Sequence, residues 1–132
     1  MDTLTKKDRE LIQSAREIIS KNYDNKDYLH TVGAALRTKN GKIYIGVNVY
    51  SLHGTCAEQV ALGTAITNGE REFDSVVAVR GPHGEEILPP CGNCCQILKD
   101  YAPDCEVILS EEGDGQKVSA SELLPFAYKV IY

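Results

Sequence analysis

Apolar and polar positions alternate along the chain with two different periods, and each period predicts one kind of secondary structure. Between Leu11 and Ile19 the apolar residues recur at helical spacing. Residues 5–8, from Thr5 to Asp8, have the form of a capping box, with Asp in the place of the preferred Glu. We therefore expect an amphipathic helix that ends near Asn22.

A β-hairpin is expected next. Residues 31–38 and 43–48 have strand character, and the Asn40-Gly41 dipeptide between them is a strong turn signal. The second strand would bring Asn48 to a loop, residues 50–55, that leads into the first cysteine motif.

Helices and strands alternate in the second half of the chain. We expect helices at residues 56–68 and 91–101, and strands at residues 75–79 and 106–109. This order favours an α/β fold in which parallel strands are joined by right-handed crossovers. Both helices would then begin at the carboxyl-terminal edge of the sheet, where open α/β sheets bind ligands.

Composition narrows the class of function. With 132 residues, 42% of them hydrophobic and 25% charged, the chain has the size of one globular domain, which we expect to span residues 1–132. The formal net charge is -5 and no basic cluster exceeds Lys6-Lys7, which argues against nucleic acid and favours a small-molecule substrate. The amino terminus has neither a signal-peptide pattern nor an apolar run, so we expect no membrane association and a cytoplasmic protein with reduced thiols.

Three cysteines have the spacing of metal ligands. Cys91 and Cys94 are two residues apart at a predicted helix start, so both thiolates can bind one Zn2+ ion, and Cys56 would supply a third. Three protein ligands leave the fourth position of tetrahedral zinc open, which is typical of a catalytic site. Glu58, beside this negatively charged cluster, suits the role of proton carrier better than that of ligand.

Three other interpretations of these residues stay open. Cys91 and Cys94 alone also fit a dithiol redox protein. A structural zinc site would need a fourth ligand, which His53 or His83 could supply. The same fold could also serve as a noncatalytic zinc-binding module.

Longer motifs surround the cysteines. The first combines Gly46-Val47-Asn48-Val49-Tyr50 with Cys56-Ala57-Glu58 and Leu62-Gly63-Thr64-Ala65, and the second is Pro90-Cys91-Gly92-Asn93-Cys94-Cys95-Gln96. In these motifs the chain, from about residue 32 to residue 128, resembles the small homotetrameric branch of the cytidine deaminase superfamily, and within it the blasticidin S deaminases. The resemblance implies a three-layer α/β/α fold with a mixed five-stranded sheet, Zn2+ at two helix N-termini and a homotetramer.

The resemblance also implies a reaction, the hydrolytic deamination of a cytosine ring, in which oxygen replaces the C4 amino group and ammonia leaves. The substrate would be cytidine, deoxycytidine or a bulkier analogue of the blasticidin S type. The biological role would accordingly be pyrimidine salvage or antibiotic resistance. Editing of RNA or DNA is the alternative within this class, and the acidic net charge argues against it.

Substrate contacts follow from the same resemblance. The backbone carbonyl groups of Ala57 and Pro89 would accept hydrogen bonds from the exocyclic amine. Cytidine deaminases carry Asn-x-Glu for the ribose hydroxyls, whereas this chain has Asn48 and Tyr50. Loss of that carboxylate weakens recognition of an ordinary ribose, because an unpartnered buried hydroxyl costs about 1–3 kcal/mol. His30 takes the place of a Phe that lies against the pyrimidine.

Two positions near the cysteines depart from the family pattern. Gln59 and Cys95 stand where relatives often place Arg, so we expect a more electron-rich metal site with a less acidic water. The amide of Gln59 could donate one hydrogen bond in compensation. Cys95 and Cys105 are expected to pack in the core.

The carboxyl-terminal segment gives weaker signals. Residues 111–115 form an acidic turn, expected to be solvated. Ser119 could cap a short helix that ends at Pro125. The tail, residues 126–132, is rich in aromatic residues and is expected to dock against this subunit or a neighbouring one. Within it, Tyr128 matches a tyrosine that lies by the pocket entrance in blasticidin S deaminases.

Overall fold

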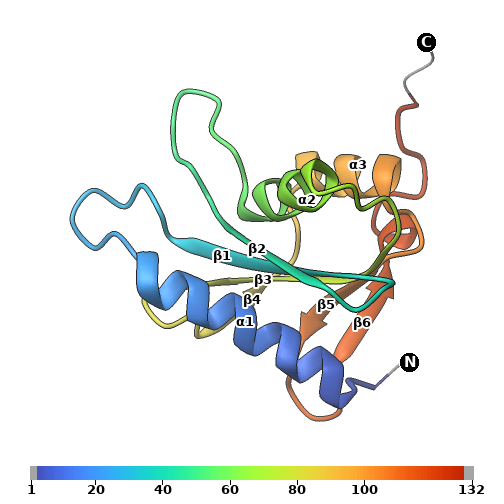
Figure 1. Ribbon diagram of the computed structural model, residues 1–132, viewed down its shortest axis with the longest axis horizontal. Coiled ribbons are helices and arrows are strands. Elements are labelled where there is room, and N and C mark those ends of the chain that lie inside the picture. The colour runs from blue at the N-terminus through green and yellow to red at the C-terminus, as the bar shows by residue number, and fades with distance from the viewer. Residues whose placement is uncertain (1–2, 130–132) are drawn as a thin grey trace.

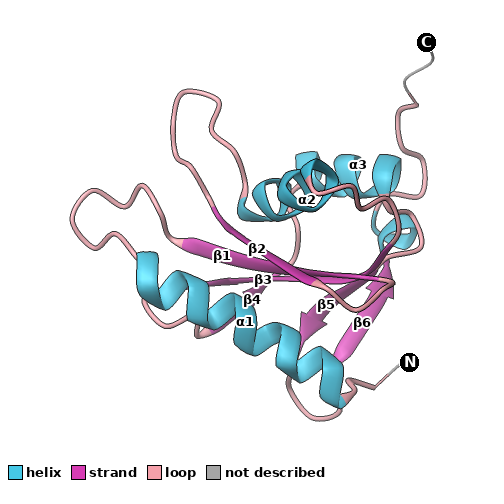
Figure 2. Cartoon of the chain, viewed as in Figure 1, coloured by secondary structure: helices cyan, strands magenta, loops and turns pink. Residues whose placement is uncertain are grey.

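A mixed β-sheet forms the middle layer of the molecule, with helix α1 on one face and helices α2 and α3 on the other (Figure 1). The structure, a computed structural model, describes residues 3–129. Figure 2 shows the same three layers by type of secondary structure. The elements are α1 (Lys6–Asn22), β1 (Val32–Thr38), β2 (Ile43–Val47), α2 (Ala57–Thr67), β3 (Phe73–Arg80), β4 (Glu86–Leu88), α3 (Gly92–Tyr101), β5 (Glu106–Ser110), β6 (Gln116–Ser119) and the 3-10 helix η1 (Ala120–Leu123).

The strand order confirms the mixed sheet. Five strands follow one another in the order β2-β1-β3-β5-β6, and the short sixth strand, β4, pairs with β3. Strands β3 and β5 are parallel, as expected, but β2 does not pair with β3. Strand β1 lies between those two and is antiparallel to both. Six of its seven residues are buried, which fits a central strand covered on both faces.

Helix α1 begins and packs as the apolar pattern predicts. The Thr5 hydroxyl accepts from the Asp8 N–H at 3.2 Å and the Asp8 carboxylate accepts from the Thr5 N–H at 2.8 Å, which completes the capping box. Leu11, Ile12, Ala15 and Ile19 are buried against the sheet. This face of the sheet contributes Ala35, Val77, Val79 and Ile108.

Helix α2 lies close to the opposite face of the sheet. A Cβ atom at Gly46 would come within 2.7 Å of the backbone nitrogen of Ala61, so only glycine allows this approach. Ala57, Ala61 and Ala65 are fully buried at the contact. The small residues therefore set how deeply α2, and with it the first cysteine motif, sits on the sheet.

Near the carboxyl terminus the structure departs from expectation. Residues 120–123 form a 3-10 helix, and the Ser119 side chain makes no capping hydrogen bond. Phe126 is 98% exposed and Tyr128 is 75% exposed, so the described part of the tail does not dock on its own subunit. The Tyr128 carbonyl accepts a hydrogen bond from the Gln96 side-chain amide at 2.8 Å. Residues 130–132 of the predicted docking segment lie outside the described residues.

Two smaller expectations concern charge and membranes. In the acidic turn, Glu111 forms an ion pair with Arg16 at 2.8 Å and is only partly exposed, so the turn is not wholly solvated. Across residues 3–129, no helix has both the length and the apolar character needed to cross a membrane.

Candidate active site

The two predicted cysteine motifs meet at the starts of two helices. Cys56 is the N-cap residue of α2 and Cys91 is the N-cap residue of α3. Their sulfur atoms lie 3.7 Å apart although 35 residues separate them in the sequence. Strand β4, which the sequence pattern did not predict, pairs antiparallel with β3 before α3 begins, so the chain reaches α3 through a hairpin and not through a direct crossover.

The sulfur atoms of Cys56, Cys91 and Cys94 fit one metal ion. All three lie within 4.8 Å of one another. Tetrahedral zinc, with Zn–S bonds of about 2.3 Å, requires sulfur atoms about 3.8 Å apart, close to the Cys56–Cys91 separation. No histidine belongs to this cluster among residues 3–129, so neither His53 nor His83 completes a closed structural site.

Electrostatics at the cluster call for a cation. Burial raises the pKa of Cys94, and the neighbouring negative charge of Glu58 raises it further. Burial also raises the pKa of Cys56. At Cys91 burial opposes ionisation, but hydrogen bonds from the backbone N–H groups of Cys94 and Asn93 bring its pKa below the usual value. Three thiolates this close need a positive ion between them, and thiolate ligands select zinc among the common divalent ions.

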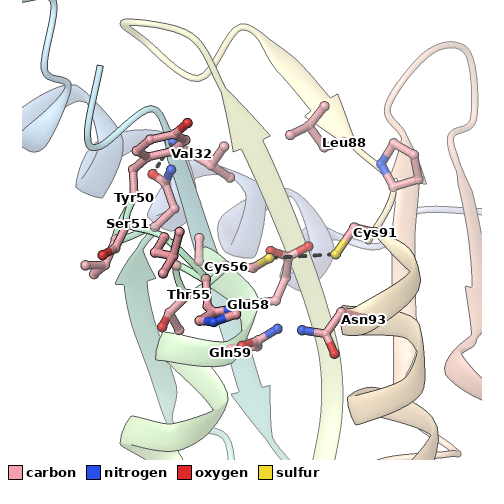
Figure 3. Close-up of a pocket in the computed structure, with 17 residues that line it drawn as sticks. Val32, Tyr50, Ser51, Thr55, Cys56, Glu58, Gln59, Leu88, Cys91 and Asn93 are labelled. Carbon is pink, nitrogen blue, oxygen red and sulfur yellow. Dashed lines mark hydrogen bonds between the residues drawn. The ribbon is translucent and has the colours of Figure 1, made fainter. Parts of the chain in front are cut away.

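Glu58 lies in the first turn of α2, and its carboxyl side chain points into the same cavity as Cys56 and Cys91 (Figure 3). The residue is only 7% exposed, and burial raises the pKa of its carboxyl group. The structure therefore places one buried carboxyl group beside the three thiols.

The two positions that depart from the family pattern have different surroundings. The Gln59 side-chain amide donates to the Cys94 sulfur at 3.6 Å, as the sequence predicts. Cys95 turns away from the cluster, where its thiol donates to the Pro90 carbonyl at 3.5 Å. Cys95 and Cys105 are both buried, which confirms the predicted core positions.

A cavity of about 450 Å³ opens next to the thiols. The loop from Val49 to Thr55 forms one wall, closed by two backbone hydrogen bonds of 2.9 Å between its ends. Four of the predicted substrate-binding residues line this cavity, and these are Asn48, Tyr50, Ala57 and Pro89.

His30 and Tyr128 are not among the lining residues of this cavity. The His30 ring nitrogen Nδ1 lies 2.8 Å from the Asn48 carbonyl oxygen, behind the wall. The Tyr128 side chain is largely exposed to solvent. Within a single subunit, therefore, neither residue is brought to the cavity.

Sequence reasoning missed several lining residues. Asn93 stands inside the second cysteine motif, so its spacing could have identified it. Val32 and Leu88 come from β1 and β4, and no local pattern marks them as neighbours of the thiols. Neither Lys nor Arg appears among the described residues that line the cavity.

A buried carboxyl group beside three thiols with the spacing of tetrahedral zinc, in an open cavity, defines the site of a zinc-dependent hydrolase. The sequence model of the family described as "Cytidine and deoxycytidylate deaminase zinc-binding region" matches residues 5–110. The chain belongs to this family and is a zinc-dependent deaminase.

Individual relatives agree with this assignment. The chain is 41% identical to the Blasticidin-S deaminase of Bacillus cereus, over 95% of this chain and 94% of that protein. It is 38% identical to the cytidine deaminase of Halalkalibacterium halodurans, over 74% of this chain and 76% of that protein. The crystal structure of cytidine deaminase from Burkholderia pseudomallei superposes with a TM-score of 0.75 at 32% identity, covering 95% of this chain and all of that one.

Proposed function

We propose that this enzyme hydrolytically deaminates the cytosine ring of a nucleoside or nucleoside analogue. In the overall reaction, water replaces the C4 amino group by an oxo group and ammonia is released. The observation that carries the proposal is the position of Glu58 in a cavity beside three thiols whose sulfur atoms all lie within 4.8 Å.

In this mechanism Cys56, Cys91 and Cys94 would hold a Zn2+ ion. When bound, zinc supplies the Lewis acidity that makes water a nucleophile near neutral pH. Glu58 would accept a proton from the attacking water and donate it to ring N3, which makes C4 electrophilic. Glu58 would then take the proton of the new C4 hydroxyl group and give it to the amine, which leaves as ammonia while C4 becomes a carbonyl. One carboxylate can make each transfer, because each leaves it in the protonation state that the next requires.

Other residues of the cavity would orient the substrate. The backbone carbonyl groups of Ala57 and Pro89 accept hydrogen bonds from the exocyclic amine. Asn48 and Tyr50 lie on the wall where the sugar would bind. A tyrosine here supplies an apolar ring in place of a carboxylate, which favours a bulky or modified sugar over plain ribose. The relative of Bacillus cereus, named Blasticidin-S deaminase, supports the same preference.

The charge of the cavity favours unphosphorylated substrates. Its described lining residues include no Lys or Arg to pair with a phosphate, and Glu58 adds negative charge. A nucleotide would therefore lose the hydration of its phosphate without gaining a charged partner. We propose that nucleosides are accepted and their monophosphates rejected.

We also propose the domain organisation, the oligomeric state and the cellular location of this enzyme. Residues 1–132 would act as one catalytic domain in a homotetramer, in which Tyr128 of each subunit could reach a neighbouring cavity. The exposed Tyr28, Leu52 and Phe126 side chains are consistent with a contact between subunits. Reduced thiols at the zinc site favour the cytoplasm.

The test is an ultraviolet deamination assay of the purified protein, with its zinc content measured after incubation with Zn2+. The panel contains cytidine, deoxycytidine, cytosine, 5-methylcytidine, blasticidin S and cytidine monophosphate. Release of ammonia from at least one nucleoside is expected, and the preferred compound separates a salvage role from a resistance role. Bound zinc with no turnover of any compound would indicate a noncatalytic module. Absence of zinc, with a disulfide that forms between Cys91 and Cys94, would indicate a dithiol redox protein.

A further inference from the structure

His30 makes a different contact from the one that its place in the sequence suggests. Its Nδ1 atom lies 2.8 Å from the backbone carbonyl oxygen of Asn48, and its side chain does not line the cavity. A carbonyl oxygen can only accept a hydrogen bond, so Nδ1 must carry the proton. The ring thus acts as a donor to the backbone of a cavity residue.

The Asn48 side chain is itself held by hydrogen bonds from the backbone of Thr31 and Val32. Its Oδ1 atom accepts from the backbone N–H of Thr31 at 2.7 Å and from that of Val32 at 3.0 Å. Its Nδ2 atom makes one long contact of 3.4 Å, with the Thr31 hydroxyl. Because an amide nitrogen has two donor hydrogens, one N–H of Asn48 remains for a ligand in the cavity.

His30 is held in turn by a preorganised loop. The Asp24 carboxylate accepts from the backbone N–H groups of Lys26, Asp27 and Leu29 at distances between 3.0 and 3.1 Å. The Asp24 N–H donates to the His30 carbonyl at 2.9 Å. The Leu29 carbonyl of this loop also accepts from the Tyr50 N–H at 3.2 Å, so the loop fixes the backbone of His30 next to the cavity wall.

We propose that His30 is a positioning residue, which holds the Asn48 carbonyl and so keeps the Asn48 amide aimed at a polar group of the substrate. Without the Nδ1–H donor, the Asn48 carbonyl is left with one bond fewer and the segment from Asn48 to Tyr50 can shift. The proposal rests on the proposed function only for the identity of the ligand.

Two substitutions separate this role from direct contact with the pyrimidine. His30→Asn removes the ring and keeps an N–H donor near the position of Nδ1. His30→Phe keeps an aromatic ring and removes the donor. We expect KM for the best nucleoside to rise about tenfold in His30→Phe, the effect of one lost hydrogen bond, with kcat unchanged. His30→Asn should stay within about threefold of wild type.

The opposite order, with His30→Asn impaired and His30→Phe normal, would show that the ring contacts the substrate and would overturn the proposal. His30→Gln, whose amide reaches the position of Nε2 and not of Nδ1, should behave like His30→Phe and serves if that variant folds poorly. His83→Phe, at an exposed histidine remote from the cavity, is the control and should leave KM unchanged.

Two further measurements test whether His30 affects substrate binding through Asn48. In an Asn48→Ala background, His30→Phe should raise KM no further, since the two residues act as a unit. Amide hydrogen exchange in residues 48–50 should be faster in His30→Phe than in wild type or His30→Asn. Unchanged exchange, or additive effects on KM, would contradict the proposal. Exchange needs no substrate, so it still tests His30 if no cytosine compound is deaminated.

Discussion

The Gln59 side-chain amide donates a hydrogen bond across two helices to the Cys94 sulfur, at 3.6 Å. Cys94 is 1% exposed, so water cannot stabilise its thiolate. Cys91, by contrast, accepts from the backbone, with the Cys94 N–H 3.5 Å from its sulfur. A neutral amide thus occupies the position where relatives often place Arg.

Gln59→Leu is therefore expected to weaken zinc binding about 10- to 100-fold, the usual effect of losing a hydrogen bond to a metal ligand. Competition with a chromophoric chelator measures the change. Asn93→Leu is the matched control, because Asn93 lines the same cavity and its side chain makes no hydrogen bond to the cluster within residues 3–129. Equal zinc affinity in Gln59→Leu and wild type would contradict the role of this amide.

Glu58→Gln should abolish most turnover while retaining fold and zinc. The substitution removes the proton carrier and hardly changes volume, so kcat should fall by about 100- to 10,000-fold. Zinc content and the melting temperature should stay close to wild type. Glu122→Gln, at an exposed carboxylate, is the control. A loss of less than about tenfold, or 1.36 kcal/mol in the barrier, would mean that another group carries the proton.

The ion pair between Asp8 and Lys117 predicts how stability changes with pH. Their charged atoms lie 2.8 Å apart, and both side chains are less than 10% exposed, at 7% and 9%. Burial of Asp8 opposes its ionisation, but Lys117 and the Thr5 N–H hold its pKa below the usual value. Burial also disfavours the charge of Lys117, yet Asp8 and Glu106 raise its pKa.

A carboxylate with a lowered pKa stabilises the fold above its ordinary pKa of 3.8, and this contribution is lost as the pH falls through the folded-state value. The raised pKa of Lys117 stabilises the fold below 10.5, and that contribution is lost as the pH rises through its folded-state value. Asp8→Asn should therefore lower the free energy of unfolding at pH 7 by about 1–3 kcal/mol, the effect of losing a hydrogen bond to a charged group.

Urea denaturation of Asp8→Asn at pH 3, 5 and 7 measures this effect. The difference from wild type should shrink as the pH falls below 3.8, because the contribution of the Asp8 carboxylate is lost on approach to its lower folded-state pKa. Glu86→Gln removes one partner of the exposed pair with Arg80 and should change stability hardly at all. A difference between Asp8→Asn and wild type that stays constant over this pH range would contradict the assigned ion pair.

Gly46 determines how closely α2 packs against the sheet. A Cβ atom there would meet the Ala61 nitrogen at 2.7 Å and the Val60 Cβ at 2.8 Å. Gly46→Ala should therefore destabilise the protein by about 1–3 kcal/mol through overpacking and, by moving Cys56, weaken zinc binding. Gly63→Ala is the matched control.

A Cβ atom at Gly63, in the same helix, meets nothing within 4 Å. Alanine there should stabilise the helix by about 0.5–1 kcal/mol and leave zinc affinity unchanged. Thermal unfolding and chelator competition on both variants measure the contrast. If Gly46→Ala kept the thermal stability and the zinc affinity of wild type, α2 would have room to move away from the sheet.

Much of the fold follows from local signals in the sequence. The capping box at Thr5, the Asn40-Gly41 turn and the alternating periods place the main helices and strands close to their observed bounds. Strands β4 and β6 escaped prediction, because three and four residues are too few to establish a period of two. The position of β1 between β2 and β3 depends on pairing between segments that are distant in the sequence. Local patterns of residues do not predict such pairing.

The sequence by itself determined the chemistry of this protein: three thiols, one carboxylate and the spacing that identifies them as a zinc-dependent deaminase site. Spacing suffices for Cys91 and Cys94 because they share one helical turn. The tertiary structure alone decided that Cys56 lies 3.7 Å from Cys91, and that His30 contacts the Asn48 backbone instead of lining the cavity. Residue type sets which bonds a side chain can make, but packing of segments remote in sequence sets which partner comes within reach.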